Sequence, residues 1–297
     1  MALGFLGKWF GGKRGDSPAL DEVRAELDRL AAESPAFAAP LKWLRELLPE
    51  LVPDAAGVSC PPLDPAQARD KLTSGVPLLR GEEVAVDPKM FRRRWRRACA
   101  ALEALQPDAA TKVLDDALKS GRLDPAALVE AVVAGRPEDV RLRAEELQLD
   151  PGLTMTLLRY TLFPSFTALA ARLAPLREGT AWERGYCPTC GSWPLLGEFR
   201  GLDQSRFLRC GLCADGWEVP RLWCPYCGGR SHEQYSFFHV EGEELKWRAA
   251  VCDACRGYTK MVATLSALPP EALLVADAAT LHLDLAAAGR GYTNAPT

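Results

Sequence analysis

The sequence predicts an α+β fold in which a mostly helical N-terminal domain is followed by two small cysteine-bearing β modules and a C-terminal helix. Three observations predict it. Residues 17–173 are rich in Ala, Leu, Glu and Arg, with apolar residues recurring every three or four positions. Four Cys-x-x-Cys pairs then fall between residues 187 and 255. Runs of aromatic and β-branched residues, typical of strands, lie between those pairs.

Composition limits the compartment and the classes of partner. The chain has 297 residues, is 48% hydrophobic and carries 36 basic against 39 acidic residues. The net charge of −3 provides no overall field that would attract nucleic acid or an anionic membrane. Residues 1–10 resemble no targeting segment, and no run is apolar enough to span a bilayer. We therefore expect a cytoplasmic protein without membrane insertion, in which ten cysteines indicate metal rather than disulfides.

The helical domain is expected at residues 17–180, after a flexible segment at residues 1–16. Ser17 and Pro18 form a plausible helix start, and prolines begin several later segments. The Pro- and Gly-rich stretch 52–88 is expected to be a loop with little regular structure. The predicted helices after the first are 36–51, 88–105, 107–121, 125–134, 137–147 and 153–173.

The cysteine region divides into two expected modules, residues 181–222 and 223–266, followed by a C-terminal helix and tail at residues 267–297. Strands are predicted at 206–209, 217–223, 234–240 and 245–251, with a hairpin turn at 241–244 around Gly242. The last helix is predicted at 271–288, and a loose tail should follow it.

Eight cysteines form the candidate metal ligands. They are Cys187, Cys190, Cys210, Cys213, Cys224, Cys227, Cys252 and Cys255. One Cys-x-x-Cys turn offers two thiolates, and two such turns complete a tetrahedron, so eight sulfurs make two closed sites for iron or zinc. Sequential pairing, first pair with second and third with fourth, is favoured; pairing of the first with the third is the alternative.

The metal is expected to stabilise these modules, because each is too small to fold on apolar burial alone. A structural site contributes on the order of 10 kcal/mol to folding. Proline and glycine within Cys187-Pro-Thr-Cys-Gly and Cys224-Pro-Tyr-Cys-Gly should stiffen the turns and permit positive φ. The surrounding aromatic residues are interpreted as apolar filling rather than as a base-stacking surface.

The basic run 91–97, the three histidines and the two remaining cysteines are interpreted as structural residues. In the basic run 91–97, Phe91 and Trp95 should point inward with Ala98 while the arginines cover the exposed face. The three histidines are spare because eight cysteines already complete two sites, and Cys60 and Cys99 are interpreted as small buried apolar residues. We find no phosphate loop, nucleophile elbow or acid–base pair that would indicate an enzyme.

With the cysteines laid out, the C-terminal part resembles the formate dehydrogenase accessory protein FdhE family. The likeness lies in Cys187-Pro-Thr-Cys-Gly-Ser192, Arg206-Phe-Leu-Arg-Cys210-Gly-Leu-Cys213, Trp217 with Arg221 before Cys224-Pro-Tyr-Cys227, Cys252-Asp-Ala-Cys255, Gly257-Tyr-Thr-Lys260, Ala276-Asp277, 281–285 and Gly291-Tyr292. The likeness is tight over roughly the last hundred residues; the helical part agrees only in general character. Arg256 and Thr259 depart from the expected pattern.

The resemblance implies a non-enzymatic maturation factor. Such a protein would have rubredoxin-like knuckles and would hold two metal ions, iron rather than zinc, on the eight cysteines. It would bind the catalytic subunit of respiratory formate dehydrogenase in the cytoplasm and support its assembly. Two alternatives stay open on sequence: a zinc-ribbon nucleic-acid-binding protein and a rubredoxin-like electron-transfer protein. The sequence does not define the docking surface or the oligomeric state.

Overall fold

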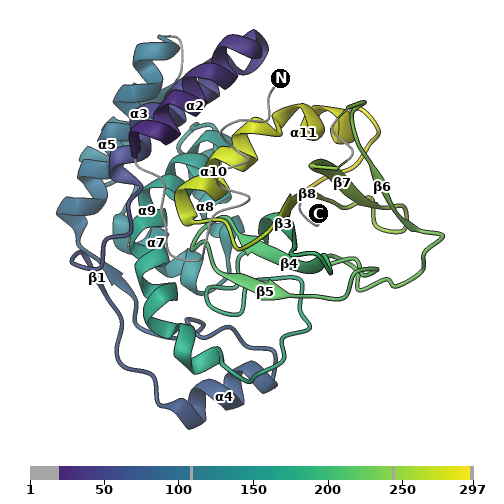
Figure 1. Ribbon diagram of the computed structural model, residues 1–297. Coiled ribbons are helices and arrows are strands. Elements are labelled where there is room, and N and C mark those ends of the chain that lie inside the picture. The colour runs from purple at the N-terminus through teal and green to yellow at the C-terminus, as the bar shows by residue number, and fades with distance from the viewer. Residues whose placement is uncertain (1–19, 108–109, 243–244, 295–297) are drawn as a thin grey trace.

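The computed structural model describes residues 20–107, 110–242 and 245–294. It places the helices on one side of the molecule and a six-stranded sheet on the other (Figure 1). The predicted flexible segment 1–16 and the helix start at Ser17 lie outside the described residues. The helices of the N-terminal part are α2 (Leu20–Glu33), α3 (Ala38–Leu47), α4 (Pro65–Thr73), α5 (Pro88–Leu105), α6 (Thr111–Lys119), α7 (Pro125–Val133), α8 (Pro137–Glu146) and α9 (Pro151–Leu173). None of these described helices has the combined length and apolar character needed to cross a membrane.

Aspartate–proline pairs begin four of the helices. Asp64, Asp87, Asp124 and Asp150 are N-caps whose carboxylates accept hydrogen bonds from backbone N–H groups of the first turn, and a proline follows each. The aspartate satisfies donors that the helix cannot, and the proline has no N–H that would need a partner. The prediction that prolines mark helix starts is confirmed at these positions.

α9 is the central helix of the N-terminal part, buried along most of its length and packed against α5 and α8. On α5 the predicted inward face is confirmed, because Phe91, Trp95 and Ala98 are buried. The prediction that every arginine of the run 91–97 is exposed was wrong for Arg94. This side chain is buried and donates to Ser165 Oγ on α9 at 2.8 Å and to Asp54 Oδ2 at 3.0 Å.

The stretch 52–88 is more regular than its Pro and Gly content predicts. It contains α4 and two short strands, β1 (Val58–Ser59) and β2 (Ala85–Val86), which pair antiparallel. The Asp64 cap is the local signal for α4, but the helix has only nine residues and few buried ones. Short 3₁₀ turns, η1 (Pro35–Phe37) and η2 (Leu48–Glu50), flank α3 within the single helix predicted at 36–51, and η3 (Ala174–Arg177) follows α9.

The sheet has the order β5-β4-β3-β8-β7-β6 and joins both cysteine modules. Its strands are β3 (Pro194–Arg200), β4 (Ser205–Cys210), β5 (Gly216–Glu218), β6 (Tyr235–Phe238), β7 (Trp247–Cys252) and β8 (Tyr258–Thr264). Each module contributes three antiparallel strands, and parallel pairing of β3 with β8 connects them. The turn predicted at 241–244 falls partly outside the described residues.

The four predicted strand runs each overlap a strand, whereas β3 and β8 were not predicted, although β8 carries the strand formers Tyr258, Val262 and Thr264. Gly197 interrupts β3, where a Cβ would lie 2.5 Å from Met261 Sδ and 2.9 Å from the Phe207 carbonyl oxygen. Glycine therefore permits the close approach of β3 to both neighbours. β8 contains the buried Lys260, which breaks the alternation expected of a strand.

The C-terminal segment forms two helices, α10 (Pro270–Ala279) and α11 (Leu281–Ala288), where one helix was predicted. The break falls at Thr280, whose hydroxyl donates to the carbonyls of Ala276 and Asp277. α10 contacts α2 and α3 of the helical part, whereas α11 contacts β7 and β8. The pair therefore connects the helices to the sheet (Figure 1).

The largest hydrophobic core runs through the helical part, the first four cysteines and α10. A separate small cluster surrounds the second cysteine group and includes Cys224, Tyr235, Cys252 and Met261. The two β modules thus share one sheet but differ in what they pack against. Their boundaries as folding units stay a prediction.

Candidate metal centres

The eight predicted cysteines converge in two groups of four. Cys187, Cys190, Cys210 and Cys213 form the first group, and Cys224, Cys227, Cys252 and Cys255 form the second, with the sulfur atoms of each group within 4.8 Å of one another. The sequential pairing favoured from sequence is therefore the one found. All eight cysteines are free thiols.

The spacing of the sulfurs suits a tetrahedral ion. Across the first group, Cys187 Sγ lies 3.5 Å from Cys213 Sγ and Cys190 Sγ lies 3.4 Å from Cys210 Sγ. The corresponding separations in the second group are 3.6 Å and 3.7 Å. A tetrahedron with metal–sulfur bonds of about 2.3 Å has edges of about 3.8 Å, whereas a disulfide would bring two sulfurs to about 2 Å. Each group could hold one metal ion.

One turn geometry is repeated at all four pairs. The backbone N–H of the first cysteine donates to the carbonyl oxygen five residues later, which fixes the loop that presents both sulfurs. These bonds run from Cys187 to Ser192 at 2.9 Å, Cys210 to Asp215 at 2.8 Å, Cys224 to Gly229 at 2.8 Å and Cys252 to Gly257 at 2.9 Å. The residue four positions after the first cysteine has positive φ in each turn: Gly191 at 82°, Ala214 at 56°, Gly228 at 73° and Arg256 at 58°.

Burial of the first group has opposite net outcomes for the pKa values of its thiols. Burial raises the pKa of Cys187 and Cys213 well above the usual range. Burial also acts on Cys190, but hydrogen bonds from the other three thiols and from the Ser192 backbone outweigh it and hold the pKa of Cys190 well below its usual value. A cation bound between the sulfurs would stabilise the thiolate forms of Cys187 and Cys213, which burial disfavours.

The two groups differ in their access to solvent. All four cysteines of the first group are at most 1% exposed. In the second group Cys224 and Cys252 are buried, while Cys227 and Cys255 reach the surface. The first group therefore has the character of an enclosed site and the second that of a surface site.

Asp215 anchors the first group to the helical part. Its carboxylate pairs with Arg177 Nη2 at 2.5 Å and accepts a hydrogen bond from Thr189 Oγ1 at 2.5 Å, and it lies 3.8 Å from Cys187 Sγ. Backbone N–H groups of Leu78 and Leu79 donate to the carbonyls of residues 188 and 189 in the first turn. Sequence reasoning missed this anchor; its local signal is the acidic residue directly after the second turn.

The end of the chain closes over the second group. Arg256 stacks on the Tyr292 ring at 3.9 Å, and Thr293 N–H donates to the Arg256 carbonyl at 2.8 Å. The Tyr226 hydroxyl donates to the carbonyls of Tyr258 and Asn294 at 2.9 Å and 2.8 Å. The expectation of a loose tail was wrong for residues 292–294, because these long-range contacts leave no periodic signal in the sequence.

The two groups lie side by side. The Tyr226 ring of the second group packs 5.4 Å from the Trp193 ring beside the first group. A Cβ on Gly185 would lie 1.8 Å from the Pro225 carbonyl oxygen, so the chain entering the first turn touches the backbone of the third. Among the described residues, no histidine joins a group of possible ligands, and Cys60 and Cys99 are buried as predicted.

Comparison with known proteins finds similar sequences and a similar fold. A family model described as "FdhE, central domain" matches residues 186–221. The "Protein FdhE homolog" of Pseudomonas aeruginosa is 31% identical over 241 residues, which covers 78% of this chain and 73% of that relative.

The chain belongs to the FdhE family.

Further comparisons agree with this assignment. The "Protein FdhE homolog" of Stutzerimonas stutzeri is 39% identical over 123 residues, a match that covers 40% of this chain and 39% of that protein. The crystal structure of the FdhE protein from Pseudomonas aeruginosa is similar over 94% of both chains, with a TM-score of 0.55 and 25% identity. The FdhE central-domain match includes the whole first cysteine group and ends before Cys224.

Proposed function

We propose that this FdhE-family protein is a maturation factor that binds the catalytic subunit of a respiratory formate dehydrogenase in the cytoplasm and supports its assembly or activation. The observation that carries the proposal is the pair of closed four-cysteine groups on rigid turns, together with the family assignment. All eight cysteines act as metal ligands in this proposal, and the ions hold the β modules in a fixed shape for docking.

A non-enzymatic role follows from the donor sets. Catalytic metal sites keep one position open for water or substrate, whereas four thiolates fill a tetrahedron. Deleting the gene should abolish formate dehydrogenase activity while the catalytic subunit is still synthesised. Full activity in the deletion strain would count directly against the proposal.

Iron is the proposed metal, by resemblance to the family. Four thiolates suit both iron and zinc, and only Fe(III) in such a site absorbs visible light through charge transfer from sulfur. Freshly purified protein should contain two ions per chain and be coloured. A colourless protein with stoichiometric zinc would contradict the choice of iron but not the ligand assignment.

Partner capture tests the docking role directly. The double variant Cys187→Ser/Cys190→Ser should lose the first ion and the ability to pull down the catalytic subunit, while far-UV circular dichroism shows the helices intact. Cys60→Ser is the matched control, because that thiol lies outside both groups and donates to the neighbouring Pro61 carbonyl at 3.5 Å. Unchanged capture by the double variant would defeat the docking proposal.

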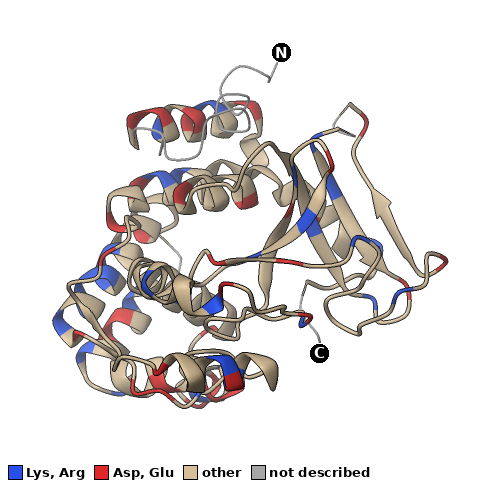
Figure 2. Cartoon of the chain, turned by 60° about the horizontal axis from the view of Figure 1, so that its bottom comes forward, with Lys and Arg blue, Asp and Glu red and all other residues tan. Residues whose placement is uncertain are grey.

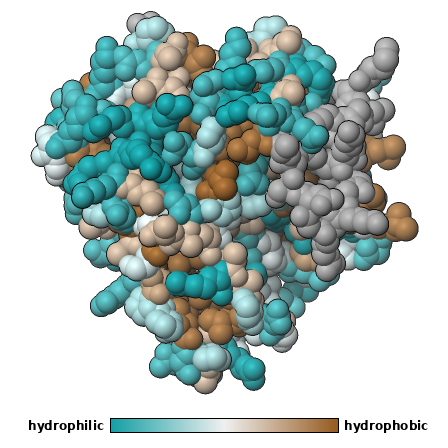
Figure 3. Space-filling view, turned by 60° about the vertical axis from the view of Figure 1, so that its left-hand side comes forward, coloured by the Kyte–Doolittle hydropathy of each residue, from teal (hydrophilic) through white to brown (hydrophobic). Residues whose placement is uncertain are grey.

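Charge distribution favours a protein partner over nucleic acid. Acidic and basic residues are interspersed on the cartoon in Figure 2, and the net charge is −3. The face in Figure 3, the left-hand side of Figure 1, is largely hydrophilic with separate small apolar spots. Backbone-phosphate binding requires a continuous basic surface. We propose that the protein does not bind nucleic acid.

Electron transfer is a second candidate because Cys227 and Cys255 bring the second site to the surface. Tunnelling to an external partner requires a short path from the metal, and the second group offers one. Dithionite should bleach the visible bands reversibly if this site cycles between oxidation states. Bands that persist under dithionite would remove this candidate.

A further inference from the structure

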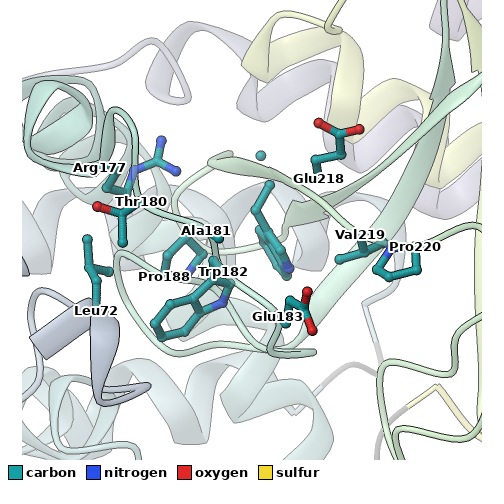
Figure 4. A pocket seen from close by; sticks show the side chains of 12 residues that line it. Leu72, Arg177, Thr180, Ala181, Trp182, Glu183, Pro188, Glu218, Val219 and Pro220 are labelled. Carbon is teal, nitrogen blue, oxygen red and sulfur yellow. The ribbon is translucent and has the colours of Figure 1, made fainter.

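A cavity of about 550 Å³ lies beside the first cysteine group, outside both ligand sets. Its walls come from the connector 177–183, from Pro188 in the first turn and from β5 with the residues that follow it. Figure 4 shows Leu72 and Arg177 at one end and Val219 and Pro220 at the other, with Trp182 between them. A second cavity of about 490 Å³ adjoins it along the same connector at Thr180 and Ala181.

β5 is an edge strand that lines this cavity, and its hydrogen-bonding pattern leaves one row of backbone groups pointing away from the sheet. Cys210 N–H donates to the Asp215 carbonyl at 2.8 Å, and Val219 N–H donates to the Arg206 carbonyl at 2.9 Å. In an antiparallel ladder these bonded positions alternate with positions whose backbone groups face the other way. Trp217 therefore pairs with β4, while the backbone groups of Gly216 and Glu218 point away from the sheet.

Part of this row has no partner among the described residues. The Gly216 N–H donates to Asp215 Oδ1 at 2.8 Å, but the Gly216 carbonyl and both backbone groups of Glu218 make no bond. An exposed edge of this kind accepts an added strand from another polypeptide. The cavity beside the strand would then receive a side chain of that peptide.

The charges around the cavity indicate which side chains a bound peptide would carry. The Arg177 guanidinium is already paired with Asp215 at 2.5 Å, so its charge is neutralised. Glu218 forms no ion pair within 4.0 Å with any described residue, although Arg200 lies near enough to interact with its charge, and Glu183 has only an exposed pair with Arg230 at 3.3 Å. Apolar walls at Leu72, Trp182 and Pro188 and carboxylates at the rim fit an extended peptide with an apolar side chain next to a basic one.

We propose that β5 and this cavity bind an extended segment of the partner enzyme by strand addition, with an apolar side chain of that segment in the cavity and a basic residue against Glu218. This inference rests on the proposed function and names the part of the surface that recognises the partner. The metal-bound turn at Pro188 forms one wall, so the first cysteine group shapes the groove.

Glu218→Pro tests the backbone pairing with little change to the fold. The substitution removes an N–H that points away from the sheet, while the bonds of Trp217 and Val219 to β4 remain, and proline is tolerated on edge strands. Glu218→Ala is the matched control, because it removes the carboxylate and keeps the N–H. Ala181→Phe is a second variant that fills the cavity from an exposed position without removing a hydrogen bond.

Binding of the catalytic subunit to the full-length protein is measured by biolayer interferometry, and overlapping peptides that tile the subunit are probed on an array. Glu218→Pro and Ala181→Phe should each weaken binding about tenfold or more, and Glu218→Ala only a few-fold. The same basic and apolar peptides should bind the wild type and fail to bind Glu218→Pro. Equal binding by Glu218→Pro and Glu218→Ala, or no peptide binding to the wild type, would contradict the proposal that a peptide binds at β5.

The result separates this inference from the proposed function. If the wild type and every variant capture the intact subunit equally well, the proposed binding site at β5 is wrong and the proposed maturation role is unaffected. If the wild type captures no subunit, the maturation role fails, and the groove fails with it. Circular dichroism and metal content of each variant confirm that a loss of binding is not a loss of folding.

Discussion

At the scale of single residues, replacing glycine at the positive-φ position of a cysteine turn should lower the free energy of unfolding by a measurable amount. A Cβ on Gly228 would have open space, its nearest neighbour being Trp223 Nε1 at 3.9 Å, whereas a Cβ on Gly191 would lie 2.7 Å from Arg80 Nη2 and 3.2 Å from Pro77 Cγ. Gly228→Ala should thus reveal backbone strain alone, about 1 kcal/mol, and Gly191→Ala should cost more. Urea unfolding of the metal-loaded variants measures both. Equal losses would show that the contacts at Gly191 carry no energy.

Glu271 provides a pH-dependent prediction at the same scale. Burial raises the pKa of this carboxyl, and Glu271 Oε2 is buried without a partner among the described residues. A raised folded-state pKa means that the protonated form favours folding, so this contribution is complete below the unfolded pKa of about 4.3 and is lost as the pH rises through the folded value.

Glu271→Gln should accordingly raise the melting temperature at pH 7 and change it little near pH 4. Thermal scans at the two pH values measure the difference. A variant that is less stable than the wild type at pH 7 would show that the helix N-terminus, and not burial, dominates at this carboxylate.

At the scale of elements, Lys260 of β8 holds both C-terminal helices. Its ammonium lies 2.7 Å from Asp277 Oδ1 on α10 and 2.7 Å from Asp284 Oδ2 on α11, and it is 4% exposed. Lys260→Met removes the ammonium shared by two carboxylates, of which Asp277 keeps only Arg159 at 4.0 Å, and should destabilise the fold by about 3–5 kcal/mol. Lys260→Met/Asp284→Asn should recover part of that loss in denaturant unfolding. Additive losses would show that the pair is not coupled.

The same lysine explains why prediction of the elements was uneven. Asp–Pro caps and helical periodicity are local signals, so α5 and α7 could be placed closely from sequence. Local signals also specify the cysteine turns, and the ligand groups follow from spacing. The residues that interrupt β8 and β3 are explained by partners far away in the chain: Lys260 pairs with two helices and Gly197 lies close to two strands, and no local pattern encodes these contacts. The closing tail was missed for the same reason, whereas Asp215 was missed although the acidic residue directly after the second turn is a local signal.

At the scale of the whole molecule, the two sites should lose their ions at different rates. The first group is enclosed in the main core with the helices, whereas the second has a small cluster of its own and two sulfurs at the surface. Local opening needs less free energy where fewer apolar contacts must break, and a chelator captures the ion during such openings. The second site should therefore release its ion about tenfold faster or more.

The time course of metal release from the wild type to excess chelator should show two kinetic phases of equal amplitude. Cys224→Ser/Cys227→Ser should retain only the slow phase, and Cys187→Ser/Cys190→Ser only the fast one. During the fast phase, hydrogen exchange should increase in residues 223–266 and in the tail at 292–294, which closes over the second group, while α9 stays protected. Simultaneous increases in hydrogen exchange in α9 and in the second module would contradict this prediction. They would mean that the six-stranded sheet couples both sites into one cooperative unit. The rate of metal loss would then depend on the shared core and not on the exposure of the sulfurs.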